Sequence, residues 1–404
     1  MTKRGAPWAR AYLVSCALAV AACTPAASES TLPAASASPD PSVPQSTAAL
    51  VDVAPPDFYH PAADLVAAAT PGQLLDSVEI KAPRGMRAWT VLYGSTGLDG
   101  QPVAVSGLVL VPAAPASGGG NPVVAWAHYT TGVADECAPS YEGLDGISPA
   151  ILLLVEDGYV VTATYYEGLG TDGIHPYLIG TSEGRSVLDS IRAVQALPDA
   201  HASDEAVVIG HSQGGHAALW AAELAPTYAP DLDVLGAMAA SPPADLLAGA
   251  TLAFDKAADG DAGVGLVFGV WSEVYGLPLD FLTDEGQQSA VCSRDACFPP
   301  DVSANPYVSD PALMADWSQR YAENSPGAVP TGVPVLVIAA DADESVAYEH
   351  QLSGVAAMCA IGDSIELQTV PGGHNESFFS DAAWTAIGAW ISDRFAGVAP
   401  VSTC

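Results

Sequence analysis

A serine between glycines, directly after an apolar run, constrains this chain more than any other feature. Residues 206–219 read AVVIGHSQGGHAAL, where aliphatic residues lead into Gly210, Ser212 and Gly214 and small residues follow. This order predicts a buried strand, a sharp turn and a helix, because glycines let the strand and the helix approach closely. Such a turn forces the serine into a strained backbone conformation. The pattern favours a nucleophile at Ser212, and the alternative is an ordinary tight turn that contains a serine.

Short aliphatic runs recur along the chain and alternate with segments of helical spacing. The clearest helix is expected over 183–197, where apolar residues return every three or four positions. Strands separated by helices predict an α/β fold with a mostly parallel sheet and helices on both faces. The expected strands are 103–111, 122–127, 159–164, 206–210, 234–240, 333–340 and 365–370.

The alternation breaks between about residues 243 and 330. This segment starts Ala-rich, ends Pro-rich and carries Trp271, Tyr275 and Phe281. A long insertion between two core strands, with several aromatic side chains, is typical of a cap over a binding pocket. The alternative is a peripheral helical subdomain. Because 50% of the 404 residues are hydrophobic and only 14% are charged, we expect one large domain over 58–404 that includes the cap.

An acid and then a histidine follow Ser212, which is the order that a serine nucleophile in a parallel sheet requires. The expected strand 333–340 leads into DADESV, which places Asp341, Asp343 and Glu344 at its carboxyl end. The strand 365–370 leads into PGGHNES, which contributes His374. Parallel strands end at one edge of the sheet, so these side chains can converge there. Taken singly, the histidine is typical of a surface loop and the aspartates of a turn, but together they indicate a triad.

A serine nucleophile also needs hydrogen-bond donors for the oxyanion of its intermediate. The backbone N–H of Gln213, the residue after the serine, is one expected donor. The second is expected from the loop HYTTGVADEC (128–137), in which Thr130 and Thr131 are well placed. The cysteines and histidines have no metal-binding spacing, so no metal and no cofactor are expected.

Several longer segments resemble the secretory lipase family, the capped α/β-hydrolases of fungi and bacteria. The resemblance covers most of residues 85–395 and is carried by AWAHYTTGVADECAPSYEG, EGLGTDGIHPYLIGTSEGRSVLDSIRA, GHSQGGHAALWAAELAPTYAPDL, DADE and GGHNE. It implies an α/β-hydrolase fold with a largely helical cap. The roles that it implies are a nucleophile at Ser212, an acid at Asp343 rather than Asp341, a base at His374, and an oxyanion pair at Thr131 and Gln213.

The resemblance also implies hydrolysis of lipid or small-molecule carboxylic esters through an acyl-enzyme. Two residues depart from the family pattern, since many bacterial members have a glycine at the position of Tyr129 and an aspartate is more usual at Tyr165. The bulk of Tyr129 would narrow the acyl side of the pocket. Two other hypotheses remain. One is a serine peptidase or amidase of the same fold, and the other is a surface binding scaffold without catalysis.

The first 57 residues are interpreted as an export signal and a tether. Residues 1–22 combine basic residues, an apolar stretch too short to span a bilayer, and small residues before Cys23. This ending resembles the lipobox of bacterial lipoproteins, which implies a lipid anchor on Cys23 at the cell surface. The alternative is an ordinary cleavage site and a secreted protein. Residues 23–57 are rich in Ala, Ser and Pro and are expected to form the tether.

Charge and cysteine content narrow the environment of the chain. The balance of 12 basic against 46 acidic residues gives a formal net charge of −34, which argues against nucleic acid and anionic membrane surfaces as partners. An exported protein meets an oxidising compartment, so two disulfides and one unpaired cysteine are expected, with the pairing left open. The cysteines concerned are Cys137, Cys292, Cys297, Cys359 and Cys404.

Overall fold

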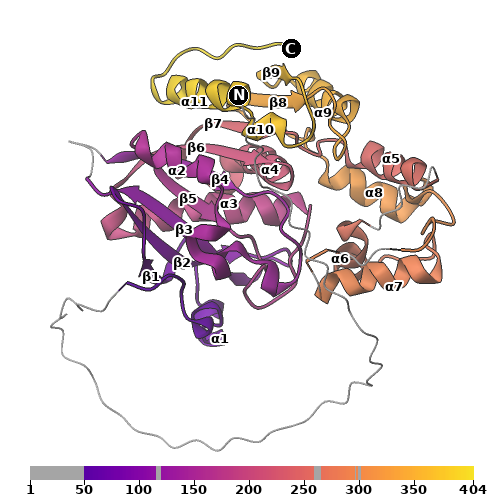
Figure 1. Ribbon diagram of the computed structural model, residues 1–404, viewed down its shortest axis with the longest axis horizontal. Coiled ribbons are helices and arrows are strands. Elements are labelled where there is room, and N and C mark those ends of the chain that lie inside the picture. Colours follow the sequence, from indigo (N-terminus) through magenta and orange to yellow (C-terminus); the bar gives the residue numbers. More distant parts are fainter. Residues whose placement is uncertain (1–49, 115–119, 259–264, 296, 299–301) are drawn as a thin grey trace, which may run out of the picture. The chain divides into compact units, whose positions relative to one another are not determined.

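A mixed β-sheet forms the centre of the fold (Figure 1). The computed structural model describes residues 50–404 except 115–119, 259–264, 296 and 299–301. In this part of the chain one nine-stranded sheet has the order β1-β2-β3-β5-β4-β6-β7-β8-β9. Its strands are β1 (Leu74–Ile80), β2 (Met86–Thr96), β3 (Pro102–Pro112), β4 (Asn121–Ala127), β5 (Val160–Thr164), β6 (Ala202–His211), β7 (Asp233–Ala240), β8 (Val335–Ala340) and β9 (Ile365–Val370).

The direction of the strands agrees with the predicted mostly parallel sheet. In the order of the sheet, neighbouring strands from β5 to β9 are parallel. On the other side, β1 pairs with β2, β2 with β3 and β3 with β5, and these three pairs are antiparallel. Each of the seven predicted strands overlaps one of the strands from β3 to β9. The hairpin of β1 and β2 was not predicted. The α/β fold class is confirmed, with an antiparallel extension at one side of the sheet.

Helices cover both faces of the sheet, as predicted. In β4, Val123 and Ala125 face a cluster formed with α3, α4 and α9. Val124 and Trp126 face the other cluster, formed with α2, α10 and α11, because successive side chains in a strand point to opposite faces. The helices outside the insertion are α1 (Ala63–Ala67), α2 (Pro149–Glu156), α3 (Gly180–Ala196), α4 (Gln213–Tyr228), α9 (Tyr348–Ala360), α10 (Glu376–Phe379) and α11 (Asp381–Phe395).

The insertion between β7 and β8 is helical, as expected of the cap. Its helices are α5 (Leu246–Ala258), α6 (Leu266–Tyr275), α7 (Asp284–Cys292) and α8 (Ala315–Asn324). Trp271, Phe281 and Trp317 are fully buried in an apolar cluster of this segment. The aromatic residues that predicted a pocket cover therefore serve mainly as the core of the cap itself.

The described part of the chain begins at residue 50, inside the predicted tether. The signal peptide 1–22, Cys23 and the tether up to residue 49 lie outside the described residues. The chain contacts the domain at Val51, which forms a β-bridge to Ile80, and at Ala54, which is buried. Over the described ranges, no helix has the length and apolar character needed to cross a bilayer.

Two disulfides join distant segments and leave one cysteine over, as expected. Cys137, in the loop segment after β4, pairs with Cys297 of the insertion. Cys359, in α9, pairs with Cys404 at the end of the chain. Cys292 is the free cysteine of the part of the chain that the structure describes. The first bridge ties the loop that carries Thr131 covalently to the cap.

A buried carboxylate on α4 makes the stability of the fold depend on pH. Glu223 is 4% exposed and accepts a hydrogen bond from the N–H of Gly327. Burial raises its pKa to about 7, although the Gly327 hydrogen bond acts in the opposite direction. The folded state therefore binds this proton more tightly than the unfolded state does. The resulting stabilisation is complete below the unfolded pKa of about 4.5 and is lost as the pH rises through 7.

We expect Glu223→Gln to raise the free energy of unfolding above pH 8 by up to about 3 kcal/mol, because the amide removes the buried charge and still accepts from Gly327. Urea unfolding between pH 4.5 and 8.5 measures the effect. The exposed carboxylate of Glu349 on α9 offers a matched control, Glu349→Gln, which removes one negative charge without the burial. An unchanged pH profile in the Glu223 variant would contradict the assignment.

Candidate functional site

The turn between β6 and α4 has the strained geometry that the sequence predicted. Ser212 has φ +57° and ψ −121°, and its N–H donates to the carbonyl of Ala240 at 2.9 Å. A Cβ on Gly210 would lie 1.9 Å from the carbonyl oxygen of Gly214, and a Cβ on Gly214 would lie 1.8 Å from that of Ala127. Both positions therefore require glycine, because the helix starts in contact with the ends of β6 and β4.

The structure brings the three predicted triad residues together at the carboxyl edge of the sheet. His374 Nε2 lies 2.9 Å from Ser212 Oγ. On the other side of the ring, His374 Nδ1 lies 2.9 Å from Asp343 Oδ2 and 3.0 Å from Oδ1. The three residues follow β6, β8 and β9, which are parallel strands, so the topology accounts for the convergence of residues 31 to 162 positions apart.

The imidazole is held by the backbone of its own loop as well as by the acid. The backbone N–H of His374 donates to Glu344 Oε2 at 3.0 Å. The His374 carbonyl accepts from Ser377 Oγ at 2.9 Å and from His211 Nε2 at 3.2 Å. These contacts fix the ring before any substrate is present.

The acid is buried but stays ionised. Burial acts to raise the pKa of Asp343, yet hydrogen bonds from His374, from the N–H of Val346 and from Ser241 outweigh it and hold the pKa below its usual value. Gln351 also donates to Asp343 Oδ2 at 2.9 Å. A carboxylate with so many donors can orient a histidine and stabilise its cation.

The neighbouring histidines add no positive charge beside His374 at neutral pH. Burial, helped by the charge of His374, lowers the pKa of His211 to about 4. Burial likewise lowers the pKa of His128, at the start of the loop after β4, to about 3. Since both rings are neutral, His374 is the imidazole of this cluster that is free to exchange a proton with Ser212.

The two predicted oxyanion donors come from the segments that meet at the turn. Gln213 is the first residue of α4, and the first N–H groups of a helix have no partner within it. Thr131 lies in the loop after β4, and its Oγ1 is buried without a hydrogen-bond partner among the described residues. Thr130 instead shares a hydrogen bond with the hydroxyl of Tyr177 at 2.9 Å. Of these two loop threonines, Thr131 is the one whose hydroxyl has no hydrogen-bond partner among the described residues.

Sequence reasoning missed two buried side chains that support the site. Gln351 of α9 donates to Asp343, and Glu183 of α3 accepts from the side chain of Gln213. Glu183 lies four positions before Val187 on the apolar face of the predicted helix, and a charged residue on such a face is the signal that could have found it. Gln351 follows no such pattern, because α9 carries small and polar residues on several faces.

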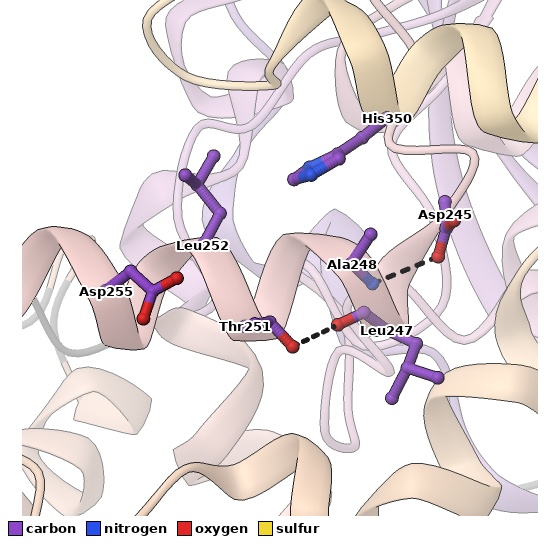
Figure 2. A pocket seen from close by; sticks show the side chains of 7 residues that line it. All are labelled: Asp245, Leu247, Ala248, Thr251, Leu252, Asp255 and His350. Atoms are coloured by element: carbon purple, nitrogen blue, oxygen red, sulfur yellow. Dashed lines mark hydrogen bonds between the residues drawn. The ribbon is translucent and has the colours of Figure 1, made fainter.

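An open pocket of about 430 Å³ lies between α5 and α9. Figure 2 shows the ring of His350 pointing toward α5, where the Ala248 N–H donates to Asp245 and Thr251 donates to the Leu247 carbonyl. The lining residues are Asp245, Leu247, Ala248, Thr251, Leu252, Asp255 and His350. The lining includes none of Ser212, Asp343, His374, Thr131 and Gln213.

The mostly parallel sheet, the helical insertion after β7 and the serine on the turn after β6 define an α/β-hydrolase. The secretory lipase family model matches residues 146–272. Over this segment the chain is similar to the secretory lipase family.

Individual relatives match longer parts of the chain. A secreted triacylglycerol lipase of Malassezia globosa is 28% identical over 352 residues, which are 78% of this chain and 74% of that protein. A probable inactive lipase of Mycobacterium tuberculosis is 32% identical over 207 residues, 47% of this chain and 45% of that protein. The X-ray structure of Candida antarctica lipase A matches with a TM-score of 0.71 and 21% identity, covering 88% of this chain and 89% of that chain. This last match shows the shared fold.

Proposed function

We propose that the protein is an exported serine ester hydrolase that cleaves carboxylic esters through an acyl-enzyme on Ser212. The observation that carries the proposal is the hydrogen-bonded chain from Ser212 Oγ through His374 to Asp343, with 2.9 Å at each step. The match to the secretory lipase family model supports ester substrates, and the Malassezia relative is named a secreted triacylglycerol lipase.

The reaction begins when Ser212 Oγ bonds to the carbonyl carbon of the ester and His374 Nε2 takes the hydroxyl proton. The Gln213 N–H and Thr131 donate to the oxyanion that forms. His374 then gives its proton to the departing alcohol oxygen as the carbon–oxygen bond breaks. Water repeats the cycle, losing a proton to His374 and releasing the carboxylic acid from Ser212. Asp343 holds the ring and stabilises its cation throughout.

Substrate size is expected to depend on Tyr129. Its ring packs against His211 and Phe379 with centroid distances of 6.0 and 6.1 Å. The ring of His211 also lies 4.8 Å, centroid to centroid, from the ring of His374. Tyr129 therefore packs against a side chain that itself contacts the proposed base. We therefore propose that its bulk limits the length of the acyl chain.

We also propose a lipid anchor at Cys23, which lies outside the described residues. Mass analysis of the mature amino terminus tests this proposal.

A fluorophosphonate probe and a panel of p-nitrophenyl esters of increasing acyl length, with peptide amides beside them, test the proposed function. We expect labelling of Ser212, turnover of the esters, a decline for the longest chains and no turnover of the amides. Turnover of amides in preference to esters would make the protein a peptidase or amidase. Absence of both labelling and turnover would leave a binding scaffold without catalysis, and the mycobacterial relative is named a probable inactive lipase.

A further inference from the structure

A fully buried carboxylate contacts the first turn of α4, directly after the turn that carries Ser212 (the nucleophile turn). Glu183 of α3 is 0% exposed. Its Oε1 accepts from the Leu178 N–H at 3.0 Å and from Gln213 Nε2 at 2.8 Å, and its Oε2 lies 2.7 Å from His216 Nδ1. Burying a carboxylate costs several kcal/mol unless partners compensate it. This one has a partner on every side, and two of the partners belong to the first turn of α4.

The imidazole of His216 must share an extra proton with Glu183. Its Nε2 lies 2.7 Å from the carbonyl oxygen of Asn324, and a carbonyl only accepts, so Nε2 carries a hydrogen. Its Nδ1 faces the carboxylate, which also only accepts when ionised. A second proton is therefore needed between the ring and Glu183. Because the carboxylate already accepts two other hydrogen bonds, which favour its ionised form, we place this proton on the ring.

The pair fixes the side chain of Gln213, the residue that follows the nucleophile. Gln213 is 1% exposed, and its Nε2 donates one hydrogen to Glu183 Oε1 and the other to His175 Nε2 at 3.0 Å. His175 can accept there because its Nδ1 donates to the Glu167 carbonyl at 3.0 Å. The side chain is thus held from two sides, which restricts the rotation of the peptide whose N–H faces the proposed oxyanion site.

The same pair connects the nucleophile turn to the cap. Asn324 is the last residue of α8, and its carbonyl accepts from His216 Nε2 and from Trp220 Nε1 at 3.1 Å. Its side-chain oxygen accepts from the N–H of Gly180 at 3.2 Å, at the start of α3. The end of the cap, the start of α3 and the first turn of α4 therefore share one set of hydrogen bonds.

We propose that Glu183 and His216 are positioning residues for the oxyanion hole. Their buried hydrogen-bonded pair holds Gln213 so that its backbone N–H points at the developing oxyanion, and the carbonyl at the end of α8 completes the set by accepting from His216 Nε2. The inference rests on the proposed ester hydrolysis, in which Gln213 supplies an oxyanion donor.

Steady-state kinetics on a p-nitrophenyl ester test the positioning. Glu183→Ala should lower kcat by about 10- to 100-fold, as expected for a misaligned oxyanion donor, with KM changed less than about threefold. Glu183→Gln should keep kcat within about threefold of the wild type. Its amide can accept from Leu178 and Gln213 and donate to His216, whose ring is then neutral.

Two further variants separate positioning from stability. Gln213→Ala keeps the backbone N–H but removes the tether, and it should lose kcat to about the same extent as Glu183→Ala. Glu223→Ala removes another buried carboxylate from α4 that contacts Gly327 rather than Gln213, and it should keep the kcat of its folded fraction. Full kcat in folded Gln213→Ala or Glu183→Ala overturns the proposal, as does an equal loss in Glu223→Ala.

Nitrogen-15 NMR of histidine-labelled protein tests the pair without any substrate. We expect one ring with both nitrogens protonated at the assay pH, assigned to His216 by its disappearance in His216→Gln, and we expect it to become singly protonated in Glu183→Gln. A singly protonated His216 in the wild type overturns the ion pair. If the wild type hydrolyses no ester while this NMR pattern is found, the proposed function fails and the ion pair stands.

Discussion

Replacing Ser212 with alanine should lower kcat/KM for p-nitrophenyl esters by about 10⁵- to 10⁶-fold, the loss that removal of a triad nucleophile causes in other serine hydrolases. The alanine leaves His374 and Asp343 in place but removes the oxygen that bonds to the ester carbon. The rate that remains should come only from oxyanion donors acting on water. Initial rates at substrate concentrations well below KM measure the loss.

The fold should survive this substitution. Alanine meets the same backbone strain at φ +57° as serine, and only the hydrogen bond to His374 Nε2 is lost, so the free energy of unfolding should change by no more than about 1 kcal/mol. Ser190, buried in α3 with its hydroxyl bonded to the Val187 carbonyl, provides the control. Ser190→Ala should retain labelling by the fluorophosphonate and full turnover. Turnover within tenfold of wild type in Ser212→Ala would remove Ser212 from the mechanism.

The parts of the fold that could be predicted are those in which burial and chain order leave few choices. The strands from β3 to β9 are short apolar runs bounded by turn residues, so composition alone locates them. The hairpin of β1 and β2 was missed because polar residues interrupt its pattern. In β2, Thr90 and Ser95 are buried, and β1 is half-exposed with Asp76 and Glu79 along it.

The candidate site divides in the same way. Ser212, Asp343 and His374 follow strand ends in a fixed order, and that order is visible in the sequence. Glu183 and Gln351 act through contacts across helices that only the packed structure brings about. The pairing of Cys137 with Cys297 was left open for the same reason, because 160 positions separate the two residues.

Asp343→Asn should lower kcat/KM by about 10⁴-fold, because it forces the wrong tautomer on the base. Asp343 Oδ1 accepts from the N–H groups of Ser345 and Val346 at 2.9 and 2.8 Å, so the oxygen of the new amide must stay there. The amide nitrogen then replaces Oδ2, which lies 2.9 Å from His374 Nδ1. It donates to Nδ1, the ring proton moves to Nε2, and the base can no longer accept the proton of Ser212.

The variant should nevertheless fold, since the oxygen of the Gln351 side chain has no partner among the described residues and can turn to accept from the new amide. Asp341 gives the matched comparison. Its Oδ1 accepts from the Gly372 N–H at 3.0 Å at an exposed position, and asparagine can make the same bond. Asp341→Asn should therefore keep kcat/KM within about threefold. A 10⁴-fold loss in that variant, with Asp343→Asn active, would transfer the role of the acid to Asp341, which the hydrogen bonds around His374 do not favour.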